Sequence, residues 1–248
     1  MLEAALPMYL RPETAPALDA LWRIIREGII ARGAALSEDL PETLAAPESL
    51  WDHWLSPDLV LSQSCSLPFR GRLRGKVEYV TTLDYGLPGC PPGHYNSVIV
   101  TRIGARPEGV LAYTSRNSQS GWATAREVME GGRATARGQI STGAHFASVE
   151  AVAEGRADWA CIDAQTWAML RRAEPVTEAL EEQFRTAPTP GLPLICAPGQ
   201  NASEIAAAVE EAVQLADAAT RETLGLQGAV RLEPEVYLDM PIPQAPAA

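Results

Sequence analysis

Two junctions between a short apolar strand and an amphipathic helix constrain this chain more than any other feature. They cover residues 111–122, LAYTSRNSQSGW, and residues 139–146, QISTGAHF. Each junction passes from apolar residues into small hydroxyl and glycine residues and then directly into a helical pattern. A helix N-terminus carries unpaired N–H groups and about half a positive charge, so it attracts anions. Two such ends, furnished with Ser, Thr and His, predict a site for a small oxyanion.

Short apolar strands alternate with helices along the whole chain, which predicts an α/β fold with mainly parallel sheets. The expected strands are residues 6–9, 59–61, 77–82, 110–114, 138–141, 157–162 and 194–197. The expected helices are residues 17–32, 48–55, 121–130, 145–154, 164–172, 203–215 and 218–224.

Two segments rich in proline and glycine, residues 87–93 and 187–193, enclose the middle of the chain. Proline restricts φ, so such segments are stiff apart from a few residues that can act as hinges. We therefore expect two lobes joined by two crossings, with residues 1–95 plus 188–248 in the first and residues 96–187 inserted as the second. The alternative is one continuous doubly wound sheet with two ordinary loops.

The net charge of −11, without any Lys/Arg-rich run, argues against nucleic acid or an anionic membrane surface as a partner. It does not exclude an anionic ligand, because local dipoles and hydrogen bonds govern a recessed site. The sequence has no run of about 18 apolar residues, so we expect no direct membrane insertion. The start, MLEAALPMYL, does not follow the secretory-signal pattern. We expect the periplasm if a leader has been removed, and the cytoplasm if Met1 is the native start.

Motifs for metal binding and catalysis are absent from the sequence. The cysteines, Cys65, Cys90, Cys161 and Cys196, lack CxxC spacing, and the three histidines lie far apart. We expect structural thiols, with a Cys65–Cys90 bridge as the alternative, and neither a metal nor a cofactor. No nucleophile elbow, phosphate loop or zinc-protease motif occurs. The sequence therefore favours a binding protein over an enzyme.

The candidate ligand contacts of the second lobe follow three expected strands. Ser118, Gln119 and Ser120 open one helix; a helix cap needs one polar side chain, whereas this start has three and a glycine. His145 falls in the first turn of the next helix, after Thr142 as the expected cap. Asp163 follows the third strand, where it could cap a helix, contact a ligand, or do both.

The candidate contacts of the first lobe also follow strands, because ligands of open α/β sheets gather at the carboxyl ends of the strands. They are Tyr9, Ser62, Gln63 and Ser64. Tyr85 and Tyr95 flank the first Pro/Gly-rich segment and either line the same cleft or pack against the hinge.

Three stretches resemble the substrate-binding proteins of phosphate/phosphonate-type ABC transporters: residues 113–122, YTSRNSQSGW; residues 142–167; and residues 187–195, APTPGLPLI. The resemblance implies a two-lobed type 2 periplasmic-binding-protein fold with the ligand cleft between the lobes. In that family a serine-rich loop at a helix start binds the phosphonate oxygens. The resemblance implies this role for Ser118, Gln119, Ser120, His145 and Asp163, and a ligand-facing position for Ser62 to Ser64.

The resulting hypothesis is a solute receptor that closes on a small oxyanion, similar to phosphate, phosphonate or sulfonate, and delivers it to an ABC permease. One alternative is a cytoplasmic enzyme of the same fold with His145 or Asp163 as the general acid or base. Another is a ligand sensor that presents its closed form to a partner protein.

Overall fold

The computed structural model describes residues 2–246, and the chain divides into two compact units. Unit 1 comprises the described residues up to Gly86 together with Pro190–Met240. Unit 2 comprises Leu87–Thr189 and the described tail from Pro241 onward. The lobe boundaries expected from the sequence, at 95/96 and 187/188, stay a prediction.

Unit 1 is built on a five-stranded sheet with the order β1-β2-β11-β3-β12. Its strands are β1 (Glu3–Ala5), β2 (Leu59–Gln63), β3 (Glu78–Asp84), β11 (Pro193–Cys196) and β12 (Gly228–Val230). Its helices are η1 (Pro7–Tyr9), α1 (Ala15–Ala31), α2 (Leu50–Trp54), α3 (Ser66–Arg70), α7 (Ala202–Leu215), α8 (Ala218–Leu224) and α9 (Glu235–Leu238).

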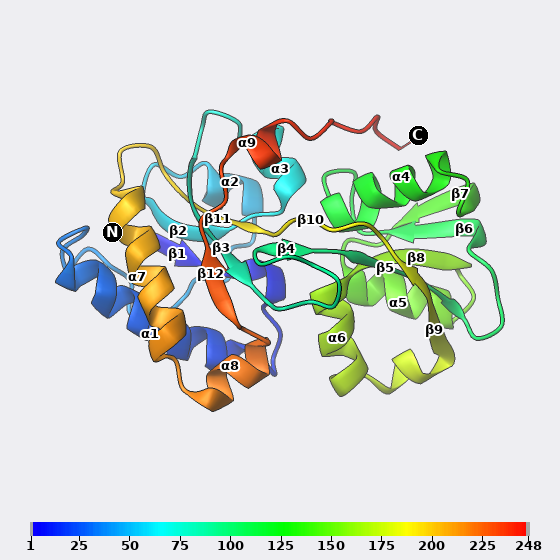
Figure 1. Ribbon diagram of the computed structural model, residues 1–248, viewed down its shortest axis with the longest axis horizontal. Helices are drawn as coiled ribbons and strands as arrows, with labels where there is room; N and C mark the ends of the chain where they lie inside the picture. Colours follow the sequence, from blue (N-terminus) through cyan, green and yellow to red (C-terminus); the bar gives the residue numbers. More distant parts are fainter. Residues whose placement is uncertain (1, 247–248) are drawn as a thin grey trace. The chain divides into compact units, whose positions relative to one another are not determined.

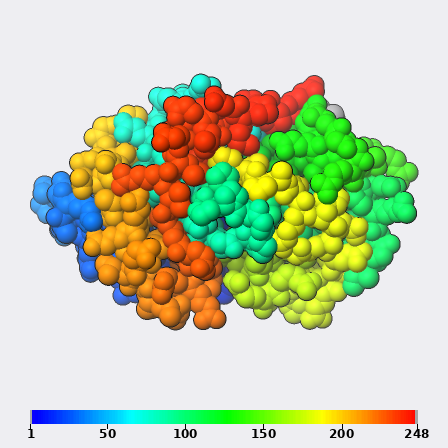
Figure 2. All heavy atoms as spheres, viewed as in Figure 1, coloured from blue at the N-terminus to red at the C-terminus, as the bar shows by residue number. Residues whose placement is uncertain are grey.

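The main core of unit 1 lies between this sheet and the helices α1 and α7, which run side by side in Figure 1. The helix α1 buries its apolar stripe, including Trp22, Ile25 and Ile29. Gly28 lets the two helices approach closely, because a Cβ at this position would lie 3.0 Å from the Cβ of Ala208. In Figure 2 the orange atoms of α7 and α8 show the solvent-facing side of this layer.

Unit 2 is built on a second five-stranded sheet, with the order β7-β6-β8-β5-β9. Its strands are β5 (Ser97–Arg102), β6 (Glu108–Tyr113), β7 (Thr135–Ser141), β8 (Trp159–Asp163) and β9 (Leu180–Arg185). Its helices are η2 (Gln119–Ala123), α4 (Thr124–Glu130), α5 (His145–Ala153), α6 (Ala164–Ala173) and η3 (Pro175–Ala179). The short strands β4 (His94–Tyr95) and β10 (Thr189–Pro190) form a separate two-stranded sheet.

The expected α/β alternation is confirmed, but the expectation of mainly parallel sheets is wrong. Parallel pairing joins β1 to β2, β6 to β7 and β6 to β8. The strands β11, β12, β5 and β9 all pair antiparallel with their neighbours. The predicted strand at residues 6–9 is also wrong: Pro7 lacks an N–H for a strand ladder, and residues 7–9 form the 3-10 helix η1.

No disulfide joins the cysteines of the described chain, so the alternative of a Cys65–Cys90 bridge is not adopted. Cys161 and Cys196 are fully buried, as expected. Burial raises the pKa of each of these two thiols to about 12, so both are held in the uncharged form. They serve as small apolar core residues.

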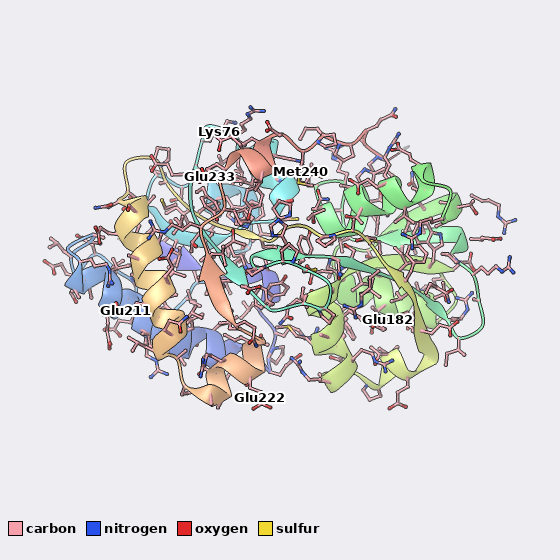
Figure 3. The ribbon with its side chains drawn as sticks, in the orientation of Figure 1. Lys76, Glu182, Glu211, Glu222, Glu233 and Met240 are labelled. Carbon is pink, nitrogen blue, oxygen red and sulfur yellow. The ribbon has the colours of Figure 1, made fainter. Side chains whose placement is uncertain are left out.

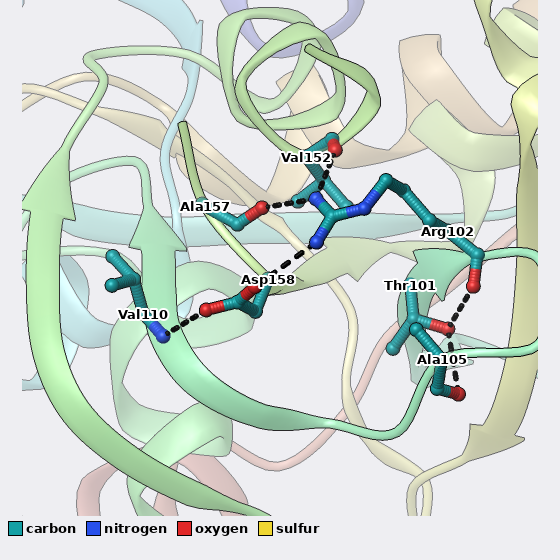
Figure 4. A network of polar contacts seen from close by, with 7 residues as sticks. All are labelled: Thr101, Arg102, Ala105, Val110, Val152, Ala157 and Asp158. Atoms are coloured by element: carbon teal, nitrogen blue, oxygen red, sulfur yellow. Dashed lines mark hydrogen bonds and ion pairs between the residues drawn. The ribbon is translucent and has the colours of Figure 1, made fainter. Parts of the chain in front are cut away.

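A polar network around Arg102 fastens one end of the unit 2 sheet (Figure 4). The Arg102 guanidinium donates to the carbonyls of Val152 and Ala157 at 2.8 and 2.7 Å, and to the Asp158 carboxylate at 3.0 Å. The other oxygen of Asp158 accepts from the backbone N–H of Val110 at 2.8 Å. That backbone bond and the Arg102 charge hold the pKa of Asp158 below its usual value.

Replacing Arg102 by methionine should lower the free energy of unfolding by about 2 kcal/mol, because charge-assisted hydrogen bonds to two carbonyls and one carboxylate are lost together. Urea unfolding of the purified protein measures this change. The matched control is Arg106→Met, a nearby exposed arginine, which should leave stability within about 0.5 kcal/mol of the original. Equal losses in both variants would contradict the role of the network.

A second polar contact fastens the edge strand β9 of the same sheet. The Trp167 indole of α6 donates to the Glu182 carboxylate of β9 at 2.7 Å, and Arg185 pairs with the same carboxylate at 3.0 Å. Glu182 is labelled in Figure 3. This contact holds the N-terminal part of α6 against the edge strand β9.

Candidate functional site

The starts of three helical segments meet at one edge of the unit 2 sheet. The strands β7, β6 and β8 are neighbours and run parallel, so their carboxyl ends share this edge. The segment η2–α4 follows β6, α5 follows β7, and α6 follows β8. The unpaired N–H groups and the positive dipole ends of these segments therefore gather in one region. The two sequence junctions and the third strand end meet as expected.

In the loop after β6 the sequence allows either Ser118 or Ser120 as the cap of the next helical segment, and the structure has Ser118 in this role. Its hydroxyl accepts from the N–H of Gly121 at 2.9 Å. The first turn is a π-turn, in which the N–H of Ala123 donates to the Ser118 carbonyl at 3.1 Å. Such turns are rare and often occur at functional sites. Gln119 is buried, and its amide donates to Thr124 at 3.4 Å.

Gly121 makes this turn possible. A Cβ there would lie 2.5 Å from the hydroxyl oxygen of Thr114 and 3.1 Å from the backbone nitrogen of Thr114. The turn therefore packs directly on the end of β6. Thr114 is 7% exposed, and its hydroxyl has no hydrogen-bond partner within the described structure. Sequence reasoning missed this residue, although a hydroxyl residue at the end of a buried strand was an available signal.

Ser120 and His145 meet across two of the helix starts. The hydroxyl of Ser120 lies 2.9 Å from Nε2 of His145, and Ser120 is buried. His145 is the first residue of α5, as expected. The expected cap, Thr142, is wrong: Ala144 occupies the cap position, and no side chain caps this helix. The Thr142 hydroxyl bonds instead to the Tyr113 carbonyl, and it lies 2.6 Å from the Ser148 hydroxyl.

His145 is partly buried and electrically neutral at physiological pH. Burial of its ring lowers the pKa of His145 to about 4. Its Nδ1 is buried and has no hydrogen-bond partner in the described structure. The serine loop therefore has a polar, uncharged neighbour whose protonated form a bound anion would favour.

Asp163 ends β8 and caps α6, as its residue type suggested. Its carboxylate accepts from the N–H of Thr166 at 2.7 Å, and the residue is 3% exposed. The capping role is confirmed, while a contact with ligand stays a prediction.

Three of the expected contacts in unit 1 come together. The rings of Tyr9 and Tyr85 meet edge to face with centroids 5.1 Å apart, and the Gln63 amide donates to the Tyr85 hydroxyl at 3.3 Å. These residues lie at or just beyond the ends of β1, β2 and β3. Those ends share one edge because β1 is parallel to β2, while β2 and β3 are both antiparallel to β11. Tyr95 is buried in β4 of unit 2.

Ser62 and Ser64 have hydrogen bonds inside unit 1. The strand β2 extends to Gln63, so the expectation that Ser62 and Gln63 lie beyond the strand is wrong. The Ser62 hydroxyl lies 3.1 Å from Nε2 of His53, and Nδ1 of His53 lies 3.2 Å from the Glu3 carboxylate. This Ser–His–Glu order resembles a catalytic triad, but Ser62 is fully buried in the ligand-free structure, and a ligand contact of Ser62 stays a prediction. The Ser64 hydroxyl donates to the carbonyl of Cys65.

Two general properties hold for the described part of the chain. Within residues 2–246, no cluster of three His, Cys, Asp or Glu side chains has a geometry that could hold a metal ion. None of the described helices combines the length and the apolar character that a membrane crossing requires.

Comparison with solved structures identifies the fold. PhnD1 of Prochlorococcus marinus, in complex with methylphosphonate, superposes with a TM-score of 0.68 at 12% identity over 96% of this chain and 94% of that chain. A binding-protein component of a phosphonate ABC transporter from Pseudomonas aeruginosa gives 0.63 at 12% identity, covering 96% and 83%. XAC2383 of Xanthomonas citri, bound to chloride ion, gives 0.65 at 14% identity, covering 95% and 92%. The expected two-lobed type 2 periplasmic-binding-protein fold is confirmed.

Comparison at the level of sequence identifies the family. No curated protein matches the chain in sequence. The family model described as ABC transporter, phosphonate, periplasmic substrate-binding protein matches residues 93–237, which is more than half of the chain. This chain therefore belongs to the family of periplasmic substrate-binding proteins of phosphonate ABC transporters.

Proposed function

We propose that this protein works in the periplasm and binds a small oxyanion of the phosphonate, phosphate or sulfonate type through the helix starts of unit 2. It then delivers the oxyanion to an ABC permease. The observation that carries the proposal is the pairing of Ser120 with neutral His145, beside the capping residue Ser118. Methylphosphonate in PhnD1 of Prochlorococcus marinus supports the ligand class. The remaining predicted contacts are Gln119, Asp163, Tyr9, Ser62, Gln63, Ser64, Tyr85 and Tyr95.

Neutral donors can bind such a ligand even though the chain as a whole is acidic, because local dipoles and hydrogen bonds govern a recessed site. Hydroxyl and backbone N–H groups at a helix start bind an anion without a buried cation, and each charge-assisted hydrogen bond contributes about 1.5–3 kcal/mol. Hydroxyl groups can also rotate to donate to whichever oxygen is charged. A ligand with three or more oxygens around one phosphorus or sulfur atom can accept from several of these groups at once.

A thermal-shift screen tests the ligand class. We expect methylphosphonate, inorganic phosphate, sulfonates or phosphate esters to raise the melting temperature. A ligand at a hundredfold excess over its dissociation constant stabilises the folded state by about 2.7 kcal/mol. Malate and lysine serve as a carboxylate and a cationic control. Stabilisation by a control compound, with none by any phosphorus or sulfur oxyanion, would contradict the proposal.

Binding should strengthen as the pH falls from 7 to 5. A bound dianion favours the protonated form of His145, so the pKa rises from about 4 and the complex takes up a proton. Calorimetry in buffers of different ionisation enthalpy should detect this proton. The His145→Asn variant should lose the proton uptake, which separates the effect of the protein from titration of the ligand itself. Uptake that persists in this variant would contradict the assignment.

The ligand-free protein should respond to pH in the opposite way. The unfolded chain binds a proton at His145 near the ordinary pKa of 6.5, whereas the folded protein binds it only near pH 4. The free energy of unfolding therefore falls as the pH drops through this range. The free energy of unfolding of the ligand-free protein should fall relative to that of His145→Asn as the pH drops from about 6.5 to about 4, and the difference between the two should be constant above that range.

A further inference from the structure

The C-terminal tail links the two units a third time. Unit 1 ends at Met240, which is labelled in Figure 3, and the described residues from Pro241 belong to unit 2. The other two passages between the units lie at Gly86–Leu87 and Thr189–Pro190. The sequence led us to expect only two crossings. A third covalent link raises the question of what fixes each end of the tail.

The end in unit 1 is fixed by Tyr237 of α9. This residue is fully buried, and its hydroxyl lies 2.6 Å from the hydroxyl of Thr82 in β3. Its ring also packs against Phe69 and Tyr79, with centroids 5.4 and 5.7 Å away. A buried aromatic residue held by a hydrogen bond and two ring contacts makes a firm anchor.

The end in unit 2 is fixed on residues 114–123, which carry Ser118 and Ser120 and are called the ligand loop below. The Trp122 indole N–H donates to the backbone carbonyl of Gln244 at 2.9 Å. Trp122 is 3% exposed, and its ring packs against Tyr113 at 5.2 Å. It belongs to the same π-turn as Ser120. Between the two anchors, Pro241 and Pro243 restrict the backbone, so the link is stiffer than an ordinary tail.

The π-turn sets the positions of Ser120 and Trp122 together, because both residues belong to it. A π-turn carries one more residue per hydrogen-bonded ring than an α-turn and is much rarer. Relaxation of this segment to an α-turn would change the register of its side chains, and we expect this change to break the contacts of Trp122 with Gln244 and of Ser120 with His145. The tail bond therefore favours the register in which Ser120 faces His145.

We propose that the C-terminal tail is a strap whose attachment to Trp122 holds the ligand loop in its binding conformation. This proposal rests on the proposed function of the same loop. Because coupling between two binding events is reciprocal, ligand binding should in turn strengthen the attachment of the tail. Trp122 then acts as a positioning residue, since it acts through the turn that carries Ser120.

The test compares the original protein with a variant that ends at Met240 and with Trp122→Phe, which keeps an aromatic ring and removes the donor. The matched control is Gln244→Ala, which keeps the backbone carbonyl. We expect the two test variants to bind methylphosphonate at least about fivefold more weakly, the order of one lost hydrogen bond. The control should bind as the original does. Equal affinity in all four proteins would overturn the proposal.

Amide hydrogen exchange of the ligand-free proteins provides a readout that needs no ligand. Residues 119–123 should exchange faster in both test variants than in the original and the control. If the original protein binds neither methylphosphonate nor any other oxyanion, the proposed function fails, while this exchange measurement still decides the strap. Unchanged exchange in the variant ending at Met240 would overturn the strap alone.

Discussion

Replacing Gly109 by alanine should lower the free energy of unfolding by about 2–6 kcal/mol, the largest loss that we expect from any single added methyl group. Gly109 lies inside β6 with φ of +110°, where a residue with a Cβ is strained by about 1–3 kcal/mol. The Cβ would also lie 2.2 Å from the carboxylate oxygen of Asp158 that accepts from Val110. Displacing that carboxylate would break the network around Arg102, at a further cost of about 1–3 kcal/mol.

Gly138 provides the matched control for this prediction. It lies in the neighbouring strand β7, pairs with Val110, and would place a Cβ no closer than 3.7 Å to any neighbour. The Gly138→Ala variant should keep its stability within about 1 kcal/mol of the original or become slightly more stable. Urea unfolding followed by tryptophan fluorescence compares the two variants. Similar losses at both glycines would show that the hydrogen bonds of the Asp158 carboxylate do not require a residue without a Cβ at position 109.

Replacing Gly121 by alanine should reduce oxyanion affinity by about 100-fold or more. The added Cβ would lie 2.5 Å from the Thr114 hydroxyl and 3.1 Å from the Thr114 backbone nitrogen, so the π-turn must move. Ser118 and Ser120 would move with it, and two charge-assisted hydrogen bonds to the ligand would be lost together. Calorimetric titration with the best oxyanion from the thermal-shift screen measures the loss.

The control for Gly121→Ala is Gly228→Ala in β12 of unit 1, where nothing lies within 4 Å of the added Cβ. This variant should bind the oxyanion as the original does. If Gly121→Ala keeps full affinity while it remains folded, the close contact between the π-turn and Thr114 is not required for binding.

The sequence predicted the helices of unit 2 and their starts well, because the signals are local. Ser118 and Asp163 are cap-forming residues placed directly before amphipathic segments, and both caps are confirmed. Thr142 is not a cap, because its hydroxyl bonds to partners on β6 and α5 instead. Such a choice depends on neighbours that the local pattern does not contain.

The strands that make the sheets mixed were harder to predict. The strand β9 has the sequence LEEQFR, whose charged residues pair with an arginine and an indole rather than marking a loop. The strand β5 begins shortly after the first Pro/Gly-rich segment, and its pairing partners lie far along the chain. Antiparallel strands of this kind are defined by long-range pairing, so a short window of sequence carries little signal for them.

The candidate site shows the same division between local and long-range information. The residue types at each strand end were visible, and so was the sheet edge that gathers them. The contact of Ser120 with His145 joins residues 25 positions apart, and the bond of Trp122 to Gln244 joins residues 122 positions apart. The internal bond of Ser62 to His53 is a third example, because it depends on how α2 packs on β2.

The most direct test of the ligand site is a calorimetric titration of the Ser118→Ala/Ser120→Ala double variant with methylphosphonate. Loss of the Ser118 cap alone costs about 1 kcal/mol of stability, so Ser49→Ala, which removes an equivalent serine cap in unit 1, is the control. We predict saturable binding by the original protein and by Ser49→Ala, and no measurable heat of binding for the double variant. Equal affinity in all three proteins would contradict the placement of the oxyanion at the helix starts of unit 2.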